Sequence, residues 1–200
     1  MCGRYYIASE DDHMAIKEII EEINNKYKGT PELSDMKTGE IRPADIAPVI
    51  TAQSPVLMKW GFTRRDGKGL VINARLETAA EKPMFRHAFA GKRCLIPASW
   101  YFEWEKHGAA RQKYAIGLRE PIFMAGLYRI DNDKMIPRFV ILTRPAAPEI
   151  AFIHNRMPVI LPKPYHEPWL NRRLDVDDVM KASVASALHY DPINFQPTLF

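Results

Sequence analysis

The chain has 200 residues, of which 46% are hydrophobic and 26% are charged, a composition typical of a soluble globular protein. That length allows one domain to bury a substantial core without disulfides or metals. No run approaches the roughly 18 apolar residues of a membrane span, and the first residues lack the basic and apolar regions of a signal peptide. We therefore expect a cytoplasmic protein.

The formal net charge is +4, with 28 basic and 24 acidic residues. This excess is compatible with nucleic-acid binding but does not argue for it. A binding role depends on whether the arginines gather around one site.

The first predicted element is an amphipathic helix over residues 9–28. Ser9 followed by Asp12 resembles a capping box. The apolar side chains that follow recur at helical spacing: Ile16, Ile19, Ile20, Ile23 and Tyr27. Residues 29–47 are polar and interrupted by prolines, so they are predicted to form a long loop.

Strands are predicted next over residues 47–51, 55–62 and 69–74, with Asp66-Gly67 as a hairpin-turn signal between the last two. A short helix follows over residues 81–90. Alternating and apolar runs then predict five more strands, over residues 93–98, 99–105, 112–118, 121–130 and 137–144.

The last third of the chain is predicted to contain a helix over residues 148–154, a strand over 157–161 and a helix over 175–187. Asp175 is the candidate cap of the final helix, with Asp178 three positions on. Many short strands with few helices indicate an α+β fold. We expect a single domain, residues 1–200, around a mostly antiparallel, barrel-like sheet with peripheral helices.

The two cysteines differ in what they suggest. Cys94 lies in an apolar run and reads as a small buried hydrophobic residue. Cys2 would become the first residue if Met1 were removed, and would then carry an amine and a thiol with pKa values of about 8 and about 8.5. Such a 1,2-aminothiol condenses with an aldehyde and closes a thiazolidine ring, because its two nucleophiles are already linked. Position alone leaves a chance cysteine open.

Asn73 ends an apolar strand pattern, and Arg75 follows two residues later. Asn73 reads either as a turn former or as an amide that binds a substrate hydroxyl or aligns the nucleophile. If the strand continues, Arg75 lies on the same face and could hold a phosphate.

Glu103 lies between Phe102 and Trp104. Burial among aromatic rings would favour its protonated form, which suits proton transfer during Schiff-base formation. Strand alternation leaves a second reading open, in which Tyr101 and Glu103 both point outward.

His154 lies between a predicted helix and a predicted strand, near Arg156. A histidine at such a boundary is often structural, but a neighbouring cation suits an anionic substrate. The remaining histidines lack metal-ligand spacing, so we expect no metal and no cofactor. Hydrolase, nucleotide and zinc-protease motifs are also absent.

Together these residues resemble the SOS response-associated peptidase (SRAP) family, also called abasic site processing proteins. The resemblance rests on blocks in the family's order: MCGR at 1–4, MKWGF at 58–62, INARLET at 72–78, RCLIPASWYFEW at 93–104, AGLY at 125–128, the threonine of ILTRPA at 143, HNRMPVIL at 154–161 and WL at 169–170.

The resemblance implies capture of abasic sites in single-stranded DNA as a thiazolidine on Cys2, after self-removal of Met1 and with a latent lyase activity. It implies that Asn73 positions the sugar and that Glu103 and His154 carry protons. It also implies DNA contacts from Arg4, Trp60, Arg75, Thr143 and Arg156. A monomer that joins the nucleoid when bound to DNA is expected.

The sequence departs from the family pattern at three places. Arg64 and Arg65 replace a usual proline and tryptophan, Ser99-Trp100 replaces an acidic-glycine pair, and the loop with Arg42-Pro43 lacks the usual asparagine. Two other functions remain open. One is a cysteine peptidase acting in trans through Cys2 and His154, and the other is a non-catalytic binder of single strands.

Overall fold

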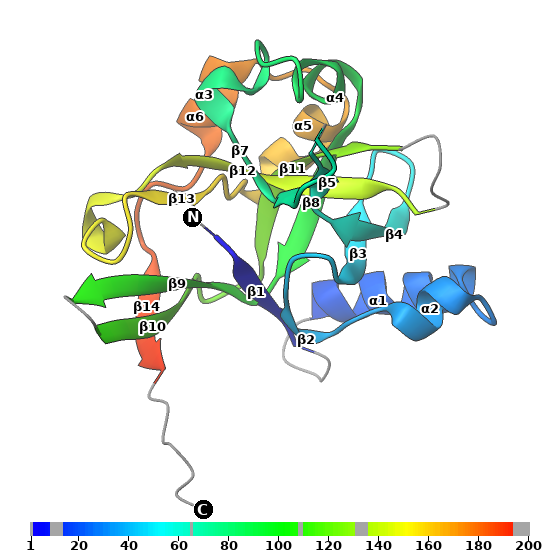
Figure 1. The fold of residues 1–200 in the computed structure, drawn as a ribbon, viewed down its shortest axis with the longest axis horizontal. Coiled ribbons are helices and arrows are strands. Elements are labelled where there is room, and N and C mark those ends of the chain that lie inside the picture. Colours follow the sequence, from blue (N-terminus) through cyan, green and yellow to red (C-terminus); the bar gives the residue numbers. More distant parts are fainter. Residues whose placement is uncertain (1, 9–13, 65, 108–109, 131–135, 194–200) are drawn as a thin grey trace, which may run out of the picture.

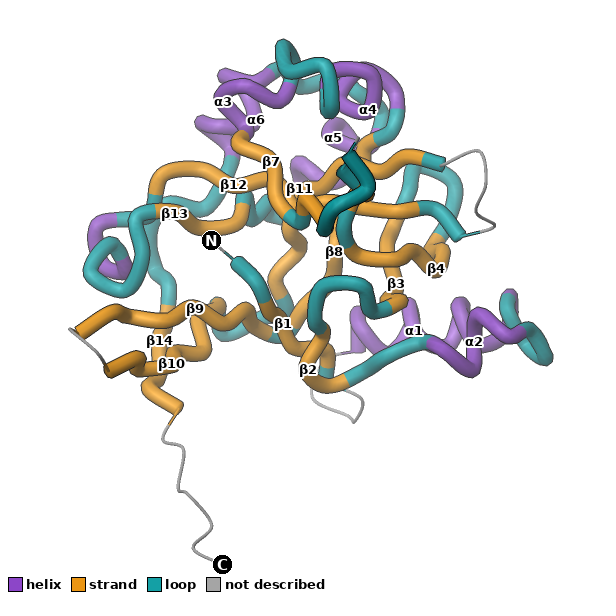
Figure 2. Tube along the Cα trace, in the orientation of Figure 1, coloured by secondary structure: helices purple, strands orange, loops and turns teal. Residues whose placement is uncertain are grey.

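Two β-sheets form the centre of the protein, and the helices lie around them (Figure 1). The computed structural model describes residues 2–8, 14–64, 66–107, 110–130 and 136–193. The tube drawing in Figure 2 shows strands at the middle and helices at the periphery. This arrangement confirms the predicted α+β fold.

The larger sheet closes on itself as a five-stranded barrel in the order β11-β8-β3-β4-β12, and β12 then pairs with β11. Its strands are β3 (Ile46–Ile50), β4 (Pro55–Trp60), β8 (Arg93–Ala98), β11 (Ile122–Arg129) and β12 (Arg138–Pro145). The β12–β4 pairing is parallel and the others are antiparallel. Two short strands extend the sheet beyond the barrel along β12, namely β7 (Asn73–Arg75) and β13 (Arg156–Pro158).

The second sheet has the order β14-β10-β9-β1-β2 and holds the start of the chain. It contains β1 (Arg4–Ile7), β2 (Gly39–Ile41), β9 (Trp100–His107), β10 (Ala110–Gly117) and β14 (His189–Ile193). Strand β1 lies between β2 and β9 and pairs antiparallel with both. The residue before this strand is therefore fixed by a sheet formed from distant parts of the sequence.

The helices are short, apart from the first. They are α1 (Met14–Lys26), α2 (Pro31–Asp35), α3 (Leu76–Ala79), α4 (Arg86–Gly91), α5 (His166–Leu170) and α6 (Val176–Ala182), with single 3-10 turns at Pro148–Ile150 and Lys163–Tyr165. Figure 1 shows α3 to α6 gathered at one end of the barrel, whereas α1 lies beside β3 and β4. No described helix is long and apolar enough to span a bilayer.

Two helix predictions are confirmed in their main part. Helix α1 buries Ile16 and Ile23 against the barrel, as its apolar spacing indicates. Its predicted start, with the Ser9 and Asp12 cap, lies outside the described residues. Helix α6 begins with the predicted cap, because the Asp175 side chain accepts from the Asp178 amide and the Asp178 side chain accepts in return. It ends at Ala182, earlier than predicted.

The prediction of a long loop over residues 29–47 is wrong. Thr30 caps α2, with Pro31 in its first turn, which is a local signal for a helix start. Residues Gly39–Ile41 form β2 because β1 offers them a partner strand, and no local pattern encodes that pairing.

Two further predicted helices are also wrong. Residues 81–90 do not form one helix; α3 ends at Ala79 and α4 begins at Arg86. The segment over 148–154 makes only a 3-10 turn, Pro148–Ile150. Residues of both segments pack into the core, as Ala88, Phe89, Ile150 and Ile153 show.

Candidate functional site

Cys2 is buried two residues before β1. Its thiol lies 3.6 Å from the main-chain oxygen of Arg4, to which it donates. Burial raises the pKa of the thiol strongly, and the nearby Glu103 carboxylate raises it further. The resting sulfur is therefore protonated at neutral pH.

Asn73 holds Cys2 from the barrel side. Its side-chain amide nitrogen donates to the main-chain oxygen of Cys2 over 2.8 Å. Asn73 lies at the start of β7, which pairs with β12, so it belongs to a strand and not to a turn. Its Oδ1 atom is buried and has no hydrogen-bond partner among the described residues. An acceptor is thus left over beside the nucleophile.

Glu103 approaches Cys2 from β9, the neighbour of β1. The side chain is 5% exposed, and Tyr101 on the same strand face is fully buried. The reading in which both point to solvent is therefore wrong. Phe102 between them is also buried, so buried and exposed residues do not alternate in this part of β9.

His154 is half-buried after the 3-10 turn that follows β12. Its Nδ1 atom accepts a hydrogen bond of 3.0 Å from the main-chain N–H of Arg156. A neutral ring in this arrangement carries its proton on Nε2.

Arg156 is held by Glu77 and Thr143. Its guanidinium forms a two-pronged ion pair with Glu77, one bond of which measures 2.8 Å, and donates to the Thr143 carbonyl over 2.6 Å. The hydrogen bond from Arg156 lowers the pKa of Glu77 and outweighs the effect of burial. Thr143 is fully buried, and its main-chain oxygen and hydroxyl both accept from Arg156.

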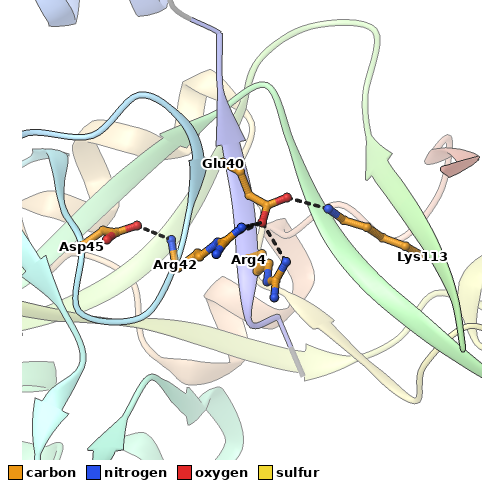
Figure 3. A network of polar contacts seen from close by, with 5 residues as sticks. All are labelled: Arg4, Glu40, Arg42, Asp45 and Lys113. Atoms are coloured by element: carbon orange, nitrogen blue, oxygen red, sulfur yellow. Dashed lines mark hydrogen bonds and ion pairs between the residues drawn. The ribbon is translucent and has the colours of Figure 1, made fainter. Parts of the chain in front are cut away.

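Arg4 belongs to a second charged cluster, shown in Figure 3. Glu40 accepts from Arg4 over 2.8 Å, from Arg42 over 3.1 Å and from Lys113 over 2.6 Å. Burial alone would raise the pKa of Glu40, but the hydrogen bond and charge of Lys113, together with Arg4, lower it overall. Three cations around one carboxylate leave this cluster positive.

Trp60 has no surface exposed to solvent. Its ring is fully buried in the core, donates from Nε1 to the Ile72 carbonyl over 3.0 Å, and packs against Tyr5 and Phe139. No face of the ring is open to a base, so the expected stacking role does not fit this structure. Arg75, by contrast, is exposed at the start of α3.

Sequence reasoning missed Glu40, Lys113 and the partner role of Glu77. Lys113 lies in a predicted strand and is 8% exposed along its side chain, yet nothing local pairs it with Glu40, which is 73 residues away.

Of the departures from the family pattern, Ser99 accepts from the Ala8 amide and Trp100 stacks on Tyr6. That pair anchors β1 to the beginning of β9.

Comparison with known proteins points to one family. Residues 1–196 match the model of the SOS response associated peptidase (SRAP) family. The abasic site processing protein YoqW of Bacillus subtilis is 32% identical over all of this chain and 98% of its own. YedK of Escherichia coli, also called an abasic site processing protein, is 25% identical over 98% of this chain and 91% of its own.

A crystal structure from Bacteroides thetaiotaomicron shares the fold. It superposes with a TM-score of 0.79 at 24% identity and covers 97% of this chain and 93% of its own. The family model spans nearly the whole sequence, and the fold agrees. This chain belongs to the SRAP family of abasic site processing proteins.

Proposed function

We propose that this protein captures abasic sites in single-stranded DNA covalently through Cys2, once Met1 has been removed. The free α-amine attacks the aldehyde of the ring-opened sugar and releases water to give an imine. The thiol then adds across the C=N bond. The sulfur forms the new C–S bond, the C=N electron pair moves to nitrogen, and the proton ends on that nitrogen.

The observation that carries the proposal is the hydrogen bond from Asn73 to the Cys2 carbonyl beside the buried Glu103. An N-terminal nucleophile is useful only if the first residue is held still, and this bond holds it. Glu103 takes protons from the amine and thiol and returns them. His154 offers an Nε2–H to the sugar oxygen as the ring opens.

Backbone contacts come from Arg4, Arg75 and Arg156. Arg75 is exposed, whereas Arg4 and Arg156 are paired with Glu40 and Glu77 and would exchange a carboxylate for a phosphate on binding. Recognition through the backbone gives little sequence preference, as a damage sensor needs. An imine at an abasic site also permits strand cleavage by β-elimination, so we propose a latent lyase activity that ring closure restrains.

The test uses a uracil-containing single strand treated with uracil glycosylase. Mature protein should give a heat-stable shifted band on a denaturing gel, and Cys2→Ala should lose it while retaining equilibrium binding. Intact mass must first show that Met1 is absent, because a retained Met1 blocks the amine. Salt-sensitive binding with no covalent band would favour a simple binder, and turnover of unrelated peptides would favour a peptidase.

A further inference from the structure

Two tyrosines face each other beside Cys2. Tyr5 on β1 and Tyr101 on β9 are directly opposite in the antiparallel pairing. Both are fully buried, and neither hydroxyl has a hydrogen-bond partner among the described residues. Residues opposite each other in such a pair place their side chains on the same face of the sheet.

Buried hydroxyls without partners are unfavourable, because each has lost its hydrogen bonds to water. Two other tyrosines, which are only partly buried, do have hydrogen-bond partners. The Tyr27 hydroxyl accepts from the Leu57 amide, and the Tyr114 hydroxyl donates to Glu105. Tyr5 and Tyr101 therefore hold two unused hydrogen-bond donors in the interior. A nearby group that accepts hydrogen bonds would compensate for the water contacts that these hydroxyls have lost.

The Cys2 thiol is the reacting group that interacts electrostatically with both tyrosines. Cys2, Tyr5 and Tyr101 belong to one buried cluster, and the thiol donates to the carbonyl of Arg4, the residue that precedes Tyr5. Burial, followed by the nearby Cys2, raises the pKa of each tyrosine well above its ordinary value. The hydroxyls thus stay protonated and act as donors, not as bases.

The resting contact of the thiol cannot survive loss of its proton. A protonated sulfur donates to the Arg4 carbonyl, but a thiolate has nothing to donate and is repelled by that oxygen. A buried anion without donors is strongly unfavourable. The hydroxyls of Tyr5 and Tyr101 lie in the same buried cluster and are donors that could stabilise it.

We propose that the hydroxyls of Tyr5 and Tyr101 bind the Cys2 sulfur as its proton leaves, and so promote the ring-closing step. The inference rests on the proposed function. In that step Glu103 takes the thiol proton, sulfur bonds to the imine carbon, the C=N pair moves to nitrogen, and Glu103 returns the proton there. Both tyrosines keep their own protons throughout.

The titratable groups that face this sulfur come from both strands. Glu103 and Tyr101 approach from β9 and Tyr5 from β1, while Tyr5 also faces Asp45 and Cys94. Substitution by phenylalanine removes only a hydroxyl and leaves Glu103 in place. A shift in the pH profile would then report the lost donors.

The experiment compares Tyr5→Phe, Tyr101→Phe and the double variant with Tyr128→Phe, a partly buried tyrosine packed on the same core. Borohydride trapping measures imine formation, and the heat-stable band without borohydride measures ring closure. The double variant should close the ring about tenfold more slowly at neutral pH, equivalent to about one unit in the thiol pKa. Its rate–pH curve should shift upward while imine formation and thermal stability are maintained.

Three results would count against these claims, and they are distinguishable. Ring closure in the double variant at the wild-type rate and pH profile overturns the inference alone. An equal loss in Tyr128→Phe assigns the effect to packing and overturns it as well. If wild-type protein forms no thiol-dependent product, the proposed function fails, and the inference fails with it.

Discussion

The side-chain amide of Asn73 donates to the main-chain oxygen of Cys2 over 2.8 Å and joins residues 71 positions apart. Asn73 begins β7, which extends the barrel sheet along β12, whereas Cys2 precedes β1 in the second sheet. This hydrogen bond therefore ties the candidate nucleophile to the barrel sheet. Its position makes it the first contact to test.

Asn73→Asp keeps the size of the side chain but places an acceptor against the Cys2 carbonyl. The loss of a buried hydrogen bond should cost about 1–3 kcal/mol in the stability of this contact, and crosslinking should slow about tenfold. Initial rates on abasic single strands measure the effect. Asn24→Asp, exposed on α1, is the control, and equal rates for both variants would contradict the role of Asn73.

The roles of the two ring nitrogens of His154 can be tested separately. His154→Asn retains an acceptor for the Arg156 amide but removes Nε2, whereas His154→Ala removes both. If Nε2 handles the proton, both variants should alter the rate of crosslink formation or reversal by about tenfold to a hundredfold. Time courses in both directions decide this. Normal kinetics in His154→Asn with a defect only in His154→Ala would indicate a structural role.

The ionisation of Glu40 should make the free energy of unfolding depend on pH in the acid range. Its pKa is lowered in the folded protein from an ordinary 4.5, so its contribution is present above that value and disappears as pH falls through the lowered pKa. Glu40→Gln should cost about 1–3 kcal/mol at neutral pH because Lys113 loses its charged partner. The difference in thermal midpoint between Glu40→Gln and wild type should disappear in strong acid. Glu22→Gln, exposed on α1, should show no such gap.

Substitutions of Arg156 should separate the effect of its charge on DNA binding from the effect of its planar geometry. Arg156→Lys retains the charge but loses the planar fork that now grips Glu77, so affinity should fall with little change in salt dependence. Arg156→Gln should also reduce the slope of log K against log salt by about 0.7. Titrations of intact single strands at several salt concentrations test this. An unchanged slope in Arg156→Gln would exclude a phosphate contact.

Gly126 on β11 allows the neighbouring strands β8 and β12 to pack closely. A Cβ there would lie 2.4 Å from a methyl of Ile96 and 2.8 Å from the Val140 carbonyl. Gly126→Ala should therefore destabilise the fold by about 1–3 kcal/mol. Urea unfolding measures it, with Gly91→Ala as the control because nothing lies within 4 Å of that site. Equal midpoints for the two variants would contradict the packing argument.

Local patterns predicted much of this fold. The apolar spacing of α1, the capping box of α6 and the strands of the barrel are written in neighbouring residues, so periodicity and caps reveal them. Strand β2 and the short helices α3 and α4 were not predicted correctly. They depend on partner strands and on the barrel surface, which a local window does not contain.

The sequence by itself determined the chemistry on offer: a cysteine at position 2, an amide, a carboxyl group, an imidazole and several arginines, in an order that resembles one family. The tertiary structure decided which of them meet. It placed Asn73 on Cys2, turned Glu103 inward, buried Trp60 and paired Arg4 and Arg156 with carboxylates. These contacts join residues far apart in the chain, and only the closure of two sheets brings such residues within hydrogen-bond distance.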